Sequence, residues 1–416
     1  MRGADSAAFD KPFRPLPIAI ANKVGTWLAR VGIGDADLTV DALMSSAARQ
    51  TGLSDFGDER FVEALGVLLR SINEEAKLSP VGRAIIRGRL TGILSNKLRT
   101  QAALSAHPEI LDTELQGPIV IAGLQRTGTT MLHRLISQDP RIRSLASWEA
   151  LNPAPLKSRL GKRDPRVRQA VLAEKGVAYM APEFFAIHPI EAEAPEEEII
   201  LLDQSFLSTS AEATMNVPSY ASWLEQQDHV PAYQALKQML QFLQWQRPGE
   251  RWVLKTPHHL EFLDPLLEVF PDATVVQTHR DPLKTSASFF SMVTHARAIF
   301  SDEVDPHAVA EHWLRKLGRM VGQAMRTRDR VKDQGFVDVS YYDLMKDPVL
   351  EVRRIYETVG WDLPDSIRAK MEASRRLNRK DRHGRHNYAL EDFGMSRQDV
   401  EPVVAEYRAR FQVPFE

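Results

Sequence analysis

The residues best suited to do chemistry lie in one short segment, 123–130, which reads GLQRTGTT. Its two glycines have the G-x-x-x-x-G spacing of a phosphate-binding loop, but Thr129-Thr130 stands where a nucleotide P-loop has Lys-Ser/Thr. The cation lies inside the loop, at Arg126. Backbone N–H groups of such a turn, and the dipole of the helix that follows, favour an anion. The segment predicts a cradle for a phosphate-like group without the usual lysine and magnesium. Its residues are Gly123, Arg126, Thr127, Gly128, Thr129 and Thr130.

Three further polar clusters each follow a segment with the composition of a buried strand. They are Lys255-Thr256-Pro257-His258-His259, His279-Arg280-Asp281-Pro282 and Tyr341-Tyr342-Asp343. Ligands of open α/β sheets bind beyond the carboxyl ends of the strands, so these clusters and the loop could share one site. Each cluster alone is also typical of a salt-bridged turn or a helix start. Cations and hydroxyls at several strand ends together favour an anion-binding edge.

Short apolar runs alternate with helical segments around these clusters and determine the expected fold. The expected strands are Pro118–Ala122, Arg251–Lys255, Ala273–His279 and Phe336–Tyr341. The expected helices are Met131–Ile136, His259–Phe270, Pro282–Thr294, Asp305–Lys332, Asp347–Gly360 and Ser396–Phe411. Strands separated by helices predict a parallel sheet with right-handed crossovers, which is an α/β fold.

The first 115 residues have a helical pattern and carry no obvious catalytic group. Apolar residues recur at helical spacing in Pro17–Val31, Leu43–Leu53 and Phe61–Ile72. Ser79-Pro80 resembles an N-cap and first turn, opening a helix that ends near Leu104. We expect residues 1–115 to form a helical extension that covers the core or packs on a second copy of the chain, as in a homodimer.

Residues 140–248 should form a helical region inserted into the α/β part. This region contains Glu196-Glu197-Glu198 directly after a proline, and His188 a little earlier. Carboxylates after a proline are typical of a helix start, where they interact favourably with the dipole. In the alternative interpretation, His188 or one glutamate faces a substrate pocket. Aromatic residues in 183–246 are more typical of core, though some could line an apolar pocket for a lipophilic or phenolic acceptor.

Composition narrows the classes of function. The formal net charge is −2 and gives no support to a nucleic-acid-binding role. The absence of cysteine excludes disulfides, thiolate catalysis and cysteine metal sites. No histidine pair has a third ligand at a recognised metal-site spacing, so we expect no metal. No run approaches the roughly 20 apolar residues of a membrane span, and we expect a cytoplasmic protein that is not integral to a membrane.

The last basic stretch, residues 375–386, is interrupted by a glycine and is not periodic, which indicates a loop. A charge run is most often a solvated surface. Here Tyr388 and Phe393 flank the run and could anchor it, as a basic loop folding over a bound anion requires. Composition leaves the two interpretations open.

Taken in order, these segments resemble the bacterial sulfotransferase family that uses 3′-phosphoadenosine-5′-phosphosulfate (PAPS). The resemblance runs from about Pro118 to the last residues. It rests on PIVIAGLQRTGTTMLHRL, RWVLKTPHHLEFLDPLLEVFPDATVVQTHRDPLKTSAS, VDVSYYDLMKDP and RHGRHNYALEDFG. It implies that residues 116–416 form a sulfotransferase domain, a P-loop NTPase-like three-layer sandwich, with the helical acceptor region inserted at about 140–248.

The resemblance also implies roles for individual residues. Arg126–Thr130 would cradle the 5′-phosphosulfate, Arg280 and Ser288 would bind the 3′-phosphate, and Tyr341 would lie by the adenine. The segment Arg382-His383-Gly384-Arg385 would close over the 3′-phosphate side.

The expected reaction is in-line transfer of a sulfuryl group from PAPS to a hydroxyl of a small molecule, which leaves 3′,5′-ADP. We expect His259, with His258 as substitute, to deprotonate the acceptor, and Lys255 and Arg126 to stabilise the transferring group. The alternatives are a P-loop kinase or other nucleotide phosphotransferase and a nucleotide-binding module without catalysis.

Overall fold

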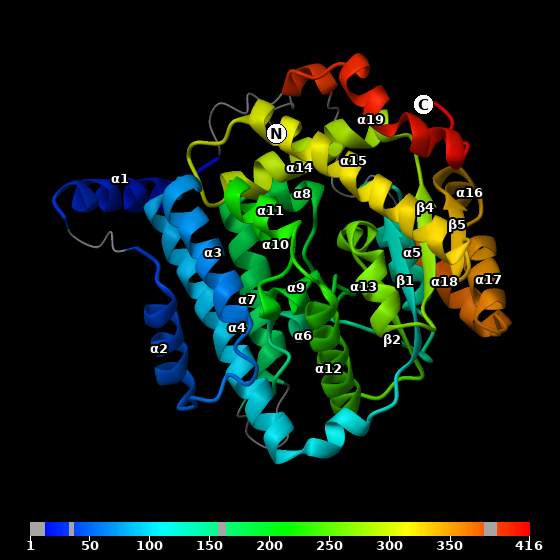
Figure 1. The fold of residues 1–416 in the computed structure, drawn as a ribbon, viewed down its shortest axis with the longest axis horizontal. Coiled ribbons are helices and arrows are strands. Elements are labelled where there is room, and N and C mark those ends of the chain that lie inside the picture. Colours follow the sequence, from blue (N-terminus) through cyan, green and yellow to red (C-terminus); the bar gives the residue numbers. More distant parts are fainter. Residues whose placement is uncertain (1–12, 33–36, 157–163, 378–388) are drawn as a thin grey trace.

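The structure is a computed structural model that describes residues 13–32, 37–156, 164–377 and 389–416. Its centre is a five-stranded parallel sheet in the order β2-β3-β1-β4-β5 (Figure 1). The strands are β1 Gln116–Gly123, β2 Ile142–Ser144, β3 Arg251–Lys255, β4 Thr274–His279 and β5 Phe336–Ser340. The middle strand is β1, with β3 and β4 on its two sides. The predicted parallel sheet is confirmed.

The described chain also contains many helices, some of which cover the two faces of this sheet. Those before β1 are α1 Leu16–Arg30, α2 Val40–Thr51, α3 Phe61–Glu75, α4 Pro80–Ala106 and the 3-10 turn η1 Pro108–Asp112. Those between β1 and β3 are α5 Thr129–Ile136, α6 Ser147–Leu151, α7 Pro165–Met180, α8 Pro182–Ile187, α9 Ile199–Leu202, η2 Asp203–Ser205, α10 Ser210–Thr214, α11 Pro218–Leu224 and α12 Val230–Gln246. The rest are η3 Pro257–Glu261, α13 Leu263–Val269, α14 Pro282–Ala298, α15 Pro306–Val331, α16 Tyr341–Lys346, α17 Pro348–Thr358, α18 Asp365–Leu377, η4 Leu390–Phe393 and α19 Arg397–Arg410.

Side chains along a strand alternate in direction, so β1 contributes to two separate cores. Ile119 and Ile121 pack with residues of α5, α16, α17 and α18, whereas Val120 and Ala122 pack with residues of α12, α13, α14, α15 and α19. In Figure 1, α17 and α18 lie on one side of the sheet, and α12 and α13 lie on the other. The result is the expected three-layer α/β/α sandwich.

The four expected N-terminal helices are present, and α4 begins as predicted, because the Ser79 hydroxyl accepts a hydrogen bond from the Gly82 N–H. Helices α2, α3 and α4 form a third core with residues of the insertion, including Phe206, Tyr220 and Leu224. The N-terminal helices therefore share their core with the inserted helices.

The structure contains one strand that was not predicted, and it differs from three local predictions. The edge strand β2 was not predicted, because three residues are too few to show a pattern. The helix expected at 259–270 is the turn η3 followed by α13, with a break at Phe262. Tyr341 opens α16 instead of ending β5, because the Ser340 hydroxyl caps that helix. Finally, Arg375 lies in α18 and not in a loop.

Candidate active site

The turn after β1 has the geometry of an anion cradle. Gly128 adopts φ 92° directly before α5, and Arg126 adopts φ 68°. A Cβ at Gly123 would lie 1.9 Å from the Thr278 hydroxyl oxygen, so only glycine fits there. The Thr127 hydroxyl lies 2.6 Å from the Thr278 hydroxyl and donates to the Leu124 carbonyl at 2.5 Å. The loop backbone is thus tied to β4, while the Arg126 and Thr130 side chains are exposed.

Lys255 lies at the end of β3, beside the loop. It is the register partner of Ile121 in β1, and its side chain is only 4% exposed. The ammonium forms an ion pair with the Glu197 carboxylate, and the Lys255 N–H donates to Glu198 at 2.8 Å. Burial raises the pKa of Glu197, but the Lys255 charge and hydrogen bonds more than offset this and bring the pKa below its ordinary value. Two of the three consecutive glutamates therefore face the end of β3.

His259 is fully buried behind this pair. Its Nε2 lies 2.5 Å from a Glu198 carboxylate oxygen, and its Nδ1 lies 2.7 Å from the Tyr233 hydroxyl. An ionised carboxylate can only accept, so Nε2–H donates to Glu198 and Nδ1 accepts from Tyr233. Both ring nitrogens are engaged, and a further proton on Nδ1 requires the Tyr233 hydroxyl to turn and accept a hydrogen bond instead of donating one.

Two other histidines have different surroundings. His258 is 3% exposed, its Nδ1 lies 3.1 Å from the Thr209 hydroxyl, and burial holds its pKa well below the ordinary value. Burial also lowers the pKa of His188 to about 4; Glu197 opposes this, and the charges of Lys255 and Arg126 reinforce it. His188 is therefore close enough to Glu197, Lys255 and the loop arginine for their charges to act on its ring. The sequence left its role open, and the structure brings it to the predicted site.

His133, on the second turn of α5, lies near the site although no sequence motif pointed to it. This ring is 1% exposed, and neither nitrogen has a hydrogen-bond partner among the described residues. Burial and the Lys255 charge hold its pKa well below the ordinary value, so the ring is neutral. Its position four residues after Thr129, one helical turn from the cradle, was the available signal.

Arg280 lies on the opposite side of the loop from Lys255, after β4. Its guanidinium is 4.0 Å from the centre of the Tyr341 ring and donates to the Arg126 carbonyl at 3.0 Å. A Cβ at Gly128 would lie 3.3 Å from that same ring, so α16 packs directly on the loop. The guanidinium also donates to both carboxylate oxygens of Glu416, at 2.6 and 2.9 Å. Arg280 thus holds an anion in the bidentate geometry that also suits phosphate.

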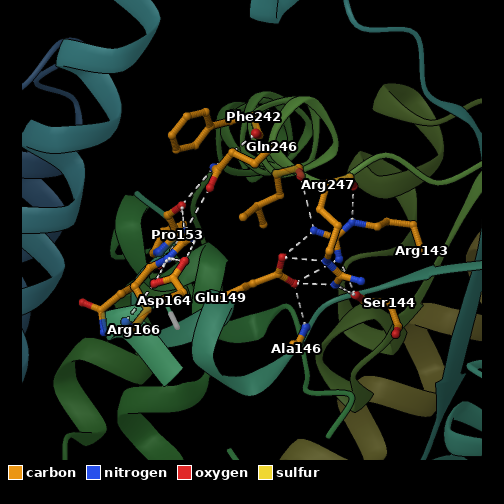
Figure 2. Close-up of polar contacts among 12 residues, drawn as sticks. Arg143, Ser144, Ala146, Glu149, Pro153, Asp164, Arg166, Phe242, Gln246 and Arg247 are labelled. Carbon is orange, nitrogen blue, oxygen red and sulfur yellow. Dashed lines mark hydrogen bonds and ion pairs between the residues drawn. The ribbon is translucent and has the colours of Figure 1, made fainter. Parts of the chain in front are cut away.

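An ionic cluster around the buried Glu149 carboxylate, shown in Figure 2, supports the strip that carries the glutamates. Glu149 accepts from Arg143 at 2.7 Å and from Arg247 at 2.8 Å, and its carboxylate caps the Ala146 N–H. Residues 145–148 then bond to residues 192–196, including the Glu196 N–H to the Leu145 carbonyl at 2.8 Å. The cluster therefore fixes the approach of Glu196–Glu198 to β3.

The turn η3 is held from its other end. Glu261 accepts from Lys316 of α15, which is fully buried, and from Arg319 at 2.5 Å. The Thr256 hydroxyl oxygen accepts from the His258 N–H at 3.3 Å. These contacts fix the segment between Lys255 and Glu261, and with it both histidines.

The remaining predicted residues are less closely tied to this arrangement. Ser288 lies in the second turn of α14, partly exposed, and no contact joins it to Arg280 in the described part of the chain. Arg382, His383, Gly384 and Arg385 lie outside the described residues. Within the described ranges, no three histidines or carboxylates are grouped as a metal site. No helix in those ranges is both long and apolar enough to span a bilayer.

The fold and the site define an α/β protein with a P-loop-like turn at the carboxyl edge of a parallel sheet, with Arg126 inside the turn and Arg280 beside it. A sequence model of the sulfotransferase family matches residues 118–365. The chain therefore belongs to the sulfotransferase family, as its motifs predict.

Individual relatives agree with this assignment. The omega-hydroxy-beta-dihydromenaquinone-9 sulfotransferase Stf3 of Mycobacterium bovis is 27% identical over 258 residues, which are 58% of this chain and 62% of that protein. The match thus spans about six-tenths of the curated relative's length. The crystal structure of sulfotransferase STF1 from Mycobacterium tuberculosis H37Rv is 35% identical, with a TM-score of 0.79, and the match covers 89% of this chain and 99% of that one. The crystal structure of sulfotransferase STF9 from Mycobacterium avium is 29% identical, with a TM-score of 0.84. That match covers 92% of this chain and 99% of that one.

Proposed function

We propose that this chain transfers a sulfuryl group from PAPS to a hydroxyl of a small lipophilic or phenolic molecule. Members of its family generally use PAPS as the donor. The observation that carries the proposal is the pair of cationic positions, Arg126 in the loop and Arg280 after β4, on one edge of the sheet. PAPS carries its charge on two separated phosphate regions and matches such a pair. The relative Stf3 is named for a hydroxylated menaquinone, which supports a lipophilic acceptor.

The donor would extend across β1 from the β3 side to the β4 side. The loop N–H groups, with Thr127, Thr129 and Thr130, would hold the 5′-phosphosulfate at the start of α5. Arg280 would hold the 3′-phosphate in place of Glu416, with Ser288 as the predicted second contact. Tyr341, against Arg280, would lie by the adenine. The closing role of Arg382-His383-Gly384-Arg385 stays a prediction.

Transfer would take place on the β3 side, where Lys255 and Arg126 neutralise the sulfuryl oxygens and the leaving phosphate oxygen. The base that takes the acceptor proton has two candidates. His259 is the residue predicted from the sequence, and it would act by releasing Tyr233. Glu197 is the second, because its carboxylate contacts Lys255 directly. If Lys255 turns to the phosphosulfate, Glu197 loses the charge that lowers its pKa, and burial then makes it a stronger base.

The proposal is tested by thermal shift of the full chain with 3′,5′-ADP, 5′-AMP and Mg-ATP. We expect 3′,5′-ADP to stabilise most. Arg280→Met should remove the preference for 3′,5′-ADP over 5′-AMP, since a charge-assisted bond to phosphate is worth about 1.5–3 kcal/mol, or about 10–150-fold in affinity.

Stabilisation by Mg-ATP alone would instead indicate a kinase. Binding of 3′,5′-ADP without sulfate transfer to any of a broad panel of alcohols and phenols would indicate a binding module without catalysis.

A further inference from the structure

Helix α1 packs on the protein through the side that carries Asn22 and Gly25, and its most exposed apolar side chains lie on another side. Its one buried residue is Asn22, which bonds to the Val81 N–H at 3.0 Å and to Asp302 at 3.3 Å. Gly25 lies against Pro80 at the start of α4. In Figure 1, α1 lies along the outside of the molecule, away from the sheet. The contacts that hold the helix therefore involve polar and small residues.

The apolar side of α1 faces outward. Its residues and exposed fractions are Leu16 72%, Ile20 52%, Val24 51%, Trp27 61% and Val31 53%. At about 100° per residue these five side chains fall within an arc of about 80°, opposite Gly25. The hydrophobic effect disfavours such a stripe in water, so we expect another apolar phase to cover it.

The charges beside the stripe indicate what covers it. Lys23 and Arg30 fall within about 40° of one edge of the stripe, and residues 13–32 contain no carboxylate. An apolar face with tryptophan, bordered by cations, is the pattern of a helix that lies in the plane of a membrane interface. The cations match the negative potential of anionic lipids.

A second copy of the chain fits less well. Five side chains at roughly 100 Å² each give roughly 500 Å², below the about 800 Å² per partner of a stable protein interface. If two copies of α1 paired antiparallel about a two-fold axis, Lys23 and Arg30 of one copy would also lie near the same cations of the other.

We propose that α1 is a docking surface for an anionic lipid bilayer, with the stripe Leu16, Ile20, Val24, Trp27 and Val31 in the interface and Lys23 and Arg30 at the headgroups. The proposal rests on α1 and not on the sulfuryl transfer. Docking of α1 would also hold the enzyme at the bilayer surface, within reach of a lipophilic acceptor dissolved in that bilayer.

The test is co-sedimentation of the full chain with phosphatidylcholine vesicles that contain phosphatidylglycerol, and with vesicles of phosphatidylcholine alone. We expect binding to the anionic vesicles that weakens in high salt. Ile20→Asp combined with Trp27→Asp should weaken it at least tenfold, and Lys23→Gln and Arg30→Gln about fivefold each. Leu350→Asp on α17, at a position 47% exposed, is the matched control and should bind as the unmodified chain does.

All variants should keep the thermal shift with 3′,5′-ADP, which separates loss of docking from loss of the donor site. Failure of the unmodified chain to bind anionic vesicles overturns the proposal. A dimer in sedimentation velocity that Ile20→Asp with Trp27→Asp converts to a monomer also overturns it, because a second copy then covers the stripe.

Discussion

The base at the transfer end of the site can be identified by comparing Glu197→Gln with His259→Gln. Both changes introduce a hydrogen-bonding amide and remove the group that could take the acceptor proton. Glu197 contacts Lys255 directly, whereas His259 contacts Glu198. We therefore expect Glu197→Gln to lower kcat by about 10²–10⁴. The affinity for 3′,5′-ADP should stay within a few-fold of the unmodified chain.

His259→Gln should act mainly on stability. The imidazole makes one bond to a buried carboxylate and one to a buried hydroxyl, worth about 1.5–3 and 0.5–1.5 kcal/mol, and glutamine can replace only one of them. The unfolding entropy of 416 residues is about 0.9 kcal/mol per kelvin at about 2.1 cal/mol per kelvin per residue. Losing about 1–3 kcal/mol then lowers Tm by about 1–3 °C.

The assays are initial rates of sulfate transfer from PAPS, calorimetric Tm and 3′,5′-ADP binding for each variant. A kcat for folded Glu197→Gln within threefold of the unmodified chain refutes the reasoning. A loss of 10² or more in His259→Gln with an unchanged Tm would assign the base to His259, as the sequence predicts.

Three further predictions concern Glu416, Glu149 and His229. Glu416→Gln should raise the affinity for 3′,5′-ADP about 5–10-fold in calorimetry, because it removes the carboxylate that competes for Arg280; unchanged affinity would place the 3′-phosphate elsewhere. Glu149→Gln should destabilise the fold by about 3–5 kcal/mol in denaturant titration, since it leaves the guanidinium of Arg143, 1% exposed, without a full counter-charge. Burial lowers the pKa of His229 to about 4 in the folded chain. Between about pH 6.5 and 4 the imidazole therefore binds a proton in the unfolded chain but not in the folded one, and stability falls as pH falls through that window. His229→Gln keeps a donor for the Leu224 carbonyl and should reduce that loss by up to about 3 kcal/mol; an unchanged slope of stability against pH would contradict the assignment.

The sequence by itself determined four of the five strands and the glycine turn that follows β1. Short apolar runs, and the glycines at 123 and 128, reflect local backbone requirements that neighbouring residues encode. This is why β1, β3, β4 and β5, and the start of α4 at Ser79-Pro80, were predictable. The family also followed, because its motifs occur in order along the chain.

Tertiary structure decided which side chains meet at that edge. Glu197 and Glu198 reach β3 across 57 or more residues, on a strip fixed by the Arg143–Glu149–Arg247 cluster, and no local pattern encodes such a contact. The burial of His259 between Glu198 and Tyr233 likewise depends on three separate elements. The direction in which α1 faces is also non-local. Its periodicity defines an apolar side, but contacts with distant residues, such as those of Asn22 with Val81 and Asp302 and of Gly25 with Pro80, turn that side outward.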